Sequence, residues 1–173
     1  GAWTRSGRKT SVGLFWYSIQ VMAQTIIMDG RAWFQVSLKV ILKKPTGEVL
    51  VLRCPSESTM AGYYDFPGGR IDRAEIKTSL KKIIAREMRE EIGNVKYRLN
   101  EKPVAFARHF YKRKNNIPRP VVWIFFEAEY RGGKVKISSE HDRFAWVRVR
   151  KNNLKHYFRK GALEGMRNYS SGR

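Results

Sequence analysis

Three glutamates in one short segment have the residue type and the spacing that metal chemistry requires. Glu87, Glu90 and Glu91 stand at i, i+3 and i+4, which places them on one face of a helix. At about 100° per residue, this face continues the apolar stripe of residues 76–84, and Arg86 falls on the opposite side. The carboxylates therefore face the body of the protein, where repulsion and burial make them costly unless a cation compensates them.

A divalent cation is the simplest compensation for this cluster. Carboxylate oxygens on a rigid helix suit Mg²⁺ or Mn²⁺, which keep several waters and share coordination with a substrate phosphate. The alternative is a solvated acidic face whose glutamates pair with lysines and arginines across a short gap. The segment upstream of the glutamates favours the metal.

That upstream segment contains a glycine pair. Gly68 and Gly69 lie between a short strand-like run, residues 63–66, and a helix expected to begin near Ile76 or Lys77. Glycines let a loop fold tightly and let backbone N–H groups approach an anion closely. We therefore expect a phosphate-binding loop that leads into the glutamate helix.

The loop and helix together resemble the signature of the Nudix hydrolase family. That pattern runs Gly, five residues, Glu, seven residues, Arg-Glu, apolar, any, Glu-Glu, any, Gly, apolar. Two positions differ here: ten residues, 76–85, stand where the family usually has seven, and the last position is Asn94. The resemblance covers roughly residues 32–160. The matching residues are Gly69, Glu75, Arg86, Glu87, Met88, Glu90, Glu91 and Gly93.

The resemblance implies an α/β fold, the Nudix α/β/α sandwich with a mixed sheet. It also implies Mg²⁺- or Mn²⁺-dependent hydrolysis of a nucleoside diphosphate linked to another moiety, such as a nucleoside triphosphate or a dinucleoside polyphosphate. Glu87, Glu90 and Glu91 would be the metal ligands, Glu90 would also be catalytic, and an ion pair of Arg86 with Glu75 would orient the loop. Gly68 and Gly69 are candidates to add a backbone carbonyl.

The general base is open between the metal cluster and a later loop, since family members differ. Glu140 and His141 occupy such a loop before Phe144, and Glu140 is our first choice outside the helix. The alternative is that Glu140 caps a turn or pairs with Arg143. We interpret His109 as a core or surface residue.

Aromatic stacking and basic clamps are expected to select the substrate. Arg53, Arg70 and Arg108 are the candidates for phosphate binding. Tyr111 also resembles the downstream tyrosine of the diadenosine polyphosphate hydrolases in this family. The aromatic candidates for a nucleobase are Tyr63, Tyr64, Phe110 and Tyr111.

Two further functions remain open. An RNA 5′-end pyrophosphohydrolase would use the basic loop 112–119 as a backbone clamp. A non-catalytic Nudix-like module would bind a nucleotide or RNA without cleaving it. Many relatives are homodimers, and the apolar segment 12–27 is a candidate for such an interface.

The composition fits a globular nucleotide-binding protein. The chain has 173 residues, 42% of them hydrophobic, and 35 Lys and Arg against 15 Asp and Glu give a formal net charge of +20. This charge attracts polyanions, although a solubilising basic surface would have the same composition. The single cysteine, Cys54, fits packing and a reducing, cytoplasmic location. No apolar run approaches the roughly 18 residues of a membrane span.

The chain reads as one domain with short extensions. Residues 1–21 form an N-terminal extension, artificial or upstream of a native start at Met22, residues 22–167 the Nudix domain and residues 168–173 a tail. The last helix should cover 152–160 and end at Gly161. Strands are expected at residues 36–42, 47–53, 63–66, 104–111, 121–130 and 144–149.

Overall fold

The computed structural model describes residues 33–58, 60–112 and 118–172. Residues 1–21, the apolar segment 12–27 and most of the basic loop 112–119 lie outside this description. From Phe34 onward the chain forms one compact unit around a six-stranded sheet. The strands are β1 (Gln35–Lys43), β2 (Val49–Arg53), β3 (Tyr64–Asp65), β4 (Lys96–Lys112), β5 (Pro118–Gly132) and β6 (Phe144–Val147).

The sheet is mixed, as predicted. Its order is β3-β2-β1-β5-β4, and β6 pairs with β2. The central pair β1 and β5 is parallel, with Gln35 opposite Val121 and Lys43 opposite Glu129. The other pairs are antiparallel. Strand β4 starts eight residues before the predicted position, because a register shift near Pro103 lets its polar first half pair with the end of β5.

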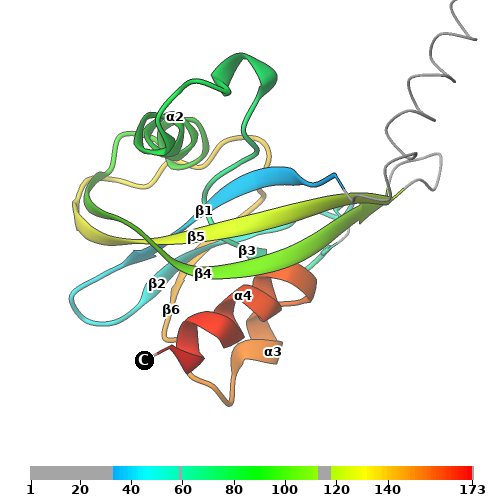
Figure 1. Ribbon diagram of the computed structural model, residues 1–173. Coiled ribbons are helices and arrows are strands. Elements are labelled where there is room, and N and C mark those ends of the chain that lie inside the picture. The colour runs from blue at the N-terminus through cyan, green and yellow to red at the C-terminus, as the bar shows by residue number, and fades with distance from the viewer. Residues whose placement is uncertain (1–32, 59, 113–117, 173) are drawn as a thin grey trace, which may run out of the picture. The chain divides into compact units, whose positions relative to one another are not determined.

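Helices cover both faces of this sheet (Figure 1). On one face lies α2 (Leu80–Ile92), preceded by the short 3₁₀ helix η1 (Arg73–Glu75). The predicted start of α2 at residue 76 or 77 is wrong, because the chain first makes a turn in which the N–H of Thr78 donates to the carbonyl of Glu75 (2.7 Å). The other face carries α3 (Leu154–Tyr157) and α4 (Lys160–Ser171).

Helix α4 corrects the prediction of a single helix at residues 152–160 that ends at Gly161. Here Gly161 and Gly165 are interior residues, and α4 continues through residue 167 to Ser171. A Cβ atom at Gly161 would lie 2.9 Å from His109 Cβ, and one at Gly165 would lie 2.3 Å from the ring of Phe125. The glycines therefore allow α4 to approach the sheet closely, a reason that no local pattern shows.

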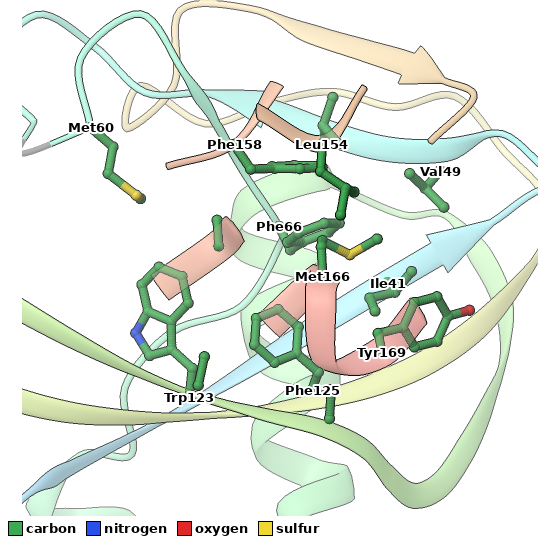
Figure 2. Packing of buried hydrophobic residues seen from close by; sticks show 14 of the residues in the cluster. Ile41, Val49, Met60, Phe66, Trp123, Phe125, Leu154, Phe158, Met166 and Tyr169 are labelled. Atoms are coloured by element: carbon green, nitrogen blue, oxygen red, sulfur yellow. The ribbon is translucent and has the colours of Figure 1, made fainter. Parts of the chain in front are cut away.

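The core beneath α3 and α4 is aromatic (Figure 2). Phe66 stacks on Phe158 with ring centroids 5.0 Å apart and meets Phe125 edge to face at 5.8 Å. Trp123 is fully buried beside them, and the ring of His109 stacks on it, so His109 is a core residue. A separate cluster, mostly aliphatic but including Phe126, fills the space between the sheet and α2. In the described parts of the chain, no helix has the length and apolar character needed to cross a membrane.

Candidate active site

The glycine loop is held against β1 by backbone hydrogen bonds. The N–H groups of Leu38 and Val40 donate to the carbonyls of Gly69 (2.9 Å) and Pro67 (2.8 Å). Gly68 has φ +124°, and a Cβ atom there would lie 2.1 Å from the carbonyl oxygen of Leu38. Only glycine fits this left-handed, crowded position. The loop is therefore tight, as predicted, and extends the sheet beside β1.

A buried lysine that the sequence analysis did not identify fixes the inner side of this loop. Lys39 Nζ donates to Asp65 Oδ2 (2.8 Å) and to the carbonyls of Phe66 (3.2 Å) and Gly68 (2.8 Å). Burial alone would lower the pKa of Lys39, but attraction to Asp65 and Glu91 raises it overall. Lys39 therefore stays charged and ties the strand before the loop to the loop itself.

Two of the three helix carboxylates face inward. Glu87 and Glu91 are buried, with 8% and 7% of their surface exposed. The N–H of Gly68 donates to Glu91 Oε2 (2.8 Å), and a Cβ atom at Gly69 would overlap the Glu87 carboxylate. Burial raises the pKa of Glu87, although Arg86 opposes this shift. Gly69, the second glycine of the loop, thus leaves room for the Glu87 carboxylate.

Glu90 does not share this inward position. Its side chain is 57% exposed, and Oε2 accepts a hydrogen bond from Arg86 Nη1 (2.8 Å). The predicted inward position of Glu90 is therefore wrong, and its carboxylate lies at the exposed rim of the site. Glu90 is thus the most accessible of the three carboxylates.

Arg86 connects the helix to the loop, and its predicted place on the opposite side of the helix is wrong. Its Nε and Nη2 donate to Glu75 Oε1 (2.7 Å) and Oε2 (2.8 Å). Nη2 also donates to Glu87 Oε1 (2.8 Å). These bonds, led by Glu75, raise the pKa of Arg86. Arg86 lines the same cavity as the glutamates, and the turn before Leu80 accommodates the additional residues, so the ion pair with Glu75 forms.

The loop before β6 brings a histidine to the carboxylates. His141 Nε2 lies 3.7 Å from Glu91 Oε1, and Nδ1 lies 3.2 Å from the carbonyl oxygen of Arg53. Burial lowers the pKa of His141, but the contact with Glu91 raises it overall. Glu140 is exposed beside it, and its N–H donates to Ser138 Oγ (3.3 Å). His141 is therefore the residue of this loop that touches the helix carboxylates.

These elements enclose one cavity of about 320 Å³. Of the predicted substrate-binding side chains, Arg70 and Tyr111 line it, with the guanidinium carbon of Arg70 5.4 Å from the centroid of the Tyr111 ring. Arg53 does not line it; its side chain instead lies 3.9 Å from Asp142. Tyr63 and Tyr64 also lie outside, against Arg159 and Tyr157. The charged and polar lining residues are Ser37, Lys39, Asp65, Arg70, Asp72, Arg86, Glu87, Glu90, Glu91, Tyr111, Glu140 and His141.

The donor set suits a hard divalent cation by its chemistry. The oxygens of Glu87, Glu90, Glu91 and Glu140 line the same cavity, and such ligands are typical of Mg²⁺ and Mn²⁺. Within the described residues, however, no group of three acidic, histidine or cysteine side chains is arranged to hold a metal ion. Arg86 holds Glu87 and Glu90, so a metal would have to exchange with its guanidinium.

Solved structures of other proteins share this fold. The chain is 25% identical to a MutT protein from Methanosarcina mazei Go1, with a TM-score of 0.63 over 80% of this chain and 92% of that one. An Ap4A hydrolase complex from C. elegans shares the fold at 21% identity, with a TM-score of 0.54 over 79% and 96% of the chains. No curated protein sequence matches the chain significantly.

A third structure of the same fold is the NUDIX domain of Shewanella oneidensis NrtR in complex with ADP ribose, at 12% identity and a TM-score of 0.56 over 89% of this chain and 96% of that one. The model of the NUDIX domain itself matches residues 33–169. These residues include the loop, the glutamate helix, α3 and all but the last two residues of α4. The chain belongs to the NUDIX family.

Proposed function

We propose that this protein is a Mg²⁺- or Mn²⁺-dependent hydrolase of phosphoanhydride bonds. Its substrate would be a nucleoside diphosphate linked to another moiety, such as a nucleoside triphosphate or a dinucleoside polyphosphate. The observation that carries the proposal is the pair of buried carboxylates, Glu87 and Glu91, packed directly against the glycine loop. Buried carboxylates are costly without a cation, and a cavity of about 320 Å³ lies beside them and the loop.

In this proposal Glu87, Glu90 and Glu91 hold the metal. When bound, the metal neutralises phosphate oxygens and makes water more acidic. The chain's own residues prepare this site. The N–H of Gly68 and the ring of His141 orient Glu91 from two sides. Arg86, clamped by Glu75, sets the distance between the loop and the helix.

Two cations and a carboxylate complete the proposed chemistry. Arg70 lines the cavity beside Tyr111 and is the candidate to hold a phosphate, with Tyr111 placed to stack against a base. Lys39 adds positive charge beneath the loop. Glu140 lines the cavity from its exposed turn, where its carboxylate can accept a proton from the attacking water. Glu90 is the alternative base.

Phosphate release from a substrate panel tests the reaction. The panel contains nucleoside triphosphates, oxidised nucleotides, ADP-ribose, diadenosine polyphosphates and 5′-triphosphorylated RNA, each with Mg²⁺ or Mn²⁺. We expect turnover of one class that is lost in Glu90→Gln and kept in Glu101→Gln, whose carboxylate pairs with Lys81 away from the site. Absence of turnover with ligand binding retained would instead support the non-catalytic module. RNA cleavage that falls steeply with salt would identify the RNA 5′-end activity.

A second pair of variants tests the general base. If Glu140 is the base, Glu140→Gln should lower kcat by a factor on the order of 10² or more, with little change in the affinity for Mg²⁺. The matched control is Glu129→Gln, a carboxylate on β5 that pairs with Arg98 and Arg131. A loss below about threefold would leave Glu140 as a turn residue and favour Glu90.

A further inference from the structure

A groove outside the candidate active site runs between the edge strand β4 and helix α4. It has a volume of about 750 Å³, larger than the active-site cavity. Asn168 Nδ2 donates to the carbonyl of Phe106 (2.7 Å), which fixes the helix to the edge of the strand. The residues that shape the groove are Arg108, Phe110, Lys160, Leu163, Glu164 and Arg167.

The charge of this groove is positive. Arg108, Lys160 and Arg167 line it, with Glu164 as the only acidic residue among the described lining residues. Glu164 is already engaged, since its Oε2 accepts the N–H of Arg108 (3.3 Å) and its Oε1 lies 3.9 Å from Arg108 Nε. The carboxylate therefore positions Arg108, and the groove as a whole favours an anionic ligand.

Two exposed phenylalanines flank Arg108 on the same strand. Phe106 is 55% exposed and Phe110 51% exposed. Because side chains alternate along a strand, Phe106, Arg108 and Phe110 share the face opposite to that of His109, about 7 Å apart in sequence order. At the edge of the sheet Arg108 and Phe110 also line the groove, and Phe106 continues the row beside it. Aromatic rings in such a row stack on unpaired nucleobases, and a guanidinium between them binds a phosphate. A duplex hides its base faces, so this row suits a single strand.

Lys160 adds an independent sign that the groove has a function. It is the only described non-glycine residue with positive φ, at 49°. This left-handed conformation costs about 1 kcal/mol or more for a residue with a side chain, and such residues concentrate at ligand-binding sites. Here the strained residue is a cation that lines the groove.

We propose that this groove, together with the exposed row on β4 beside it, binds single-stranded nucleic acid. Phe110 in the groove and Phe106 next to it stack on bases, and Arg108, Lys160 and Arg167 contact phosphates. Adjacent residues of β4 line the two sites, Phe110 the groove and Tyr111 the active-site cavity. Binding in the groove does not require the proposed hydrolysis, so each can fail without the other.

Binding of a fluorescein-labelled 12-nucleotide single-stranded RNA tests this proposal. Fluorescence anisotropy is measured in EDTA, so that metal-dependent turnover cannot contribute. The double variant Phe106→Leu/Phe110→Leu should bind this RNA at least tenfold more weakly than the wild type. The reason is the loss of two stacked bases, since stacking contributes about 1–3 kcal/mol per base. The matched control is Phe144→Leu, an exposed phenylalanine on β6, which should bind as the wild type does.

Salt dependence separates the groove from the general basic charge. Arg167→Gln should reduce the slope of log Kd against log salt concentration by about 1, because one phosphate contact is lost. Wild-type affinity in both groove variants, or equal affinity for duplex RNA of the same sequence, would overturn the proposal. Equal binding of polyglutamate would also overturn it and indicate a site for acidic peptides. Unchanged thermal unfolding of the variants would show that they remain folded.

Discussion

Trp123 lies between two basic residues, of which the protein keeps one charged and the other neutral. On the side of β1, Lys39 Nζ lies 5.0 Å from the centroid of the Trp123 ring. On the side of β4, the imidazole of His109 stacks on Trp123 with centroids 4.7 Å apart and planes 18° apart. Both side chains are almost completely buried.

Burial acts in the same direction on the two residues, so their partners decide the outcome. Burial lowers the pKa of His109 to about 4, and the attraction of Asp65 is too weak to prevent it. Burial also lowers the pKa of Lys39, but Asp65 in direct contact and Glu91 nearby raise it overall. A buried base therefore stays charged here only where a carboxylate touches it, at the active-site side of the indole.

Removing the charge of Lys39 should have the largest effect. Lys39→Met leaves Asp65 buried without its cation, together with two carbonyls that lose a donor. Breaking a buried ion pair in this way typically costs about 3–5 kcal/mol. We expect a loss of that size in the free energy of unfolding, measured by urea denaturation.

The double variant Lys39→Met/Asp65→Asn provides the control for this prediction. It removes both charges, so its loss should be smaller than that of Lys39→Met alone, because the two residues are coupled. A double variant whose loss equals the sum of the two single losses would mean that the pair does not act as a unit.

His109, which is neutral in the folded protein, should make the free energy of unfolding depend on pH. The folded state holds the pKa of His109 near 4 against an ordinary value of 6.5. Between these values the unfolded chain binds more protons, so stability rises with pH through this window and is lost as pH falls. From pH 7 to pH 5, His109 should account for a loss of about 2 kcal/mol. Urea denaturation at both values measures it.

The variant His109→Gln isolates this contribution. His141 acts in the opposite direction because its pKa is raised, so the wild-type slope alone is a mixture. The difference in free energy of unfolding between pH 7 and pH 5 should be smaller in His109→Gln than in the wild type. Equal differences would show that folding does not lower the pKa of His109.

The sequence predicted the first hairpin and the glycine loop well because their patterns are local. The hairpin of residues 36–42 and 47–53 shows alternation and a turn, and β1 and β2 lie within two residues of it. The glycines predicted a tight loop, and Gly68 requires one. The sequence did not identify Lys39 as a site residue, because alternation along β1 shows which residues share a face but not that both faces of the strand are covered.

Other features depend on contacts between distant segments. Gly161 resembles the glycine that ends a helix. Glycine is required there because α4 approaches His109 closely, and His109 lies 52 residues away in sequence. Glu140 and His141 were both candidates on residue type alone. Only the fold shows that His141 is half-buried against Glu91 while Glu140 is exposed. Such choices require knowledge of which face of a turn is buried, and sequence periodicity does not supply it.

The exposed ion pair of Lys81 with Glu101 is almost the same length as the buried pair of Lys39 with Asp65. Breaking it should have the smallest effect on stability, so it is the control for the buried pair. Lys81 Nζ lies 2.7 Å from Glu101 Oε1, as close as Lys39 to Asp65, but its side chain is 64% exposed. Water solvates both partners when the pair is broken, and surface ion pairs contribute little. Lys81→Met, the same substitution as at Lys39, should leave the urea midpoint unchanged within error. A loss comparable to that of Lys39→Met would mean that the length of an ion pair, and not its burial, sets its contribution in this protein.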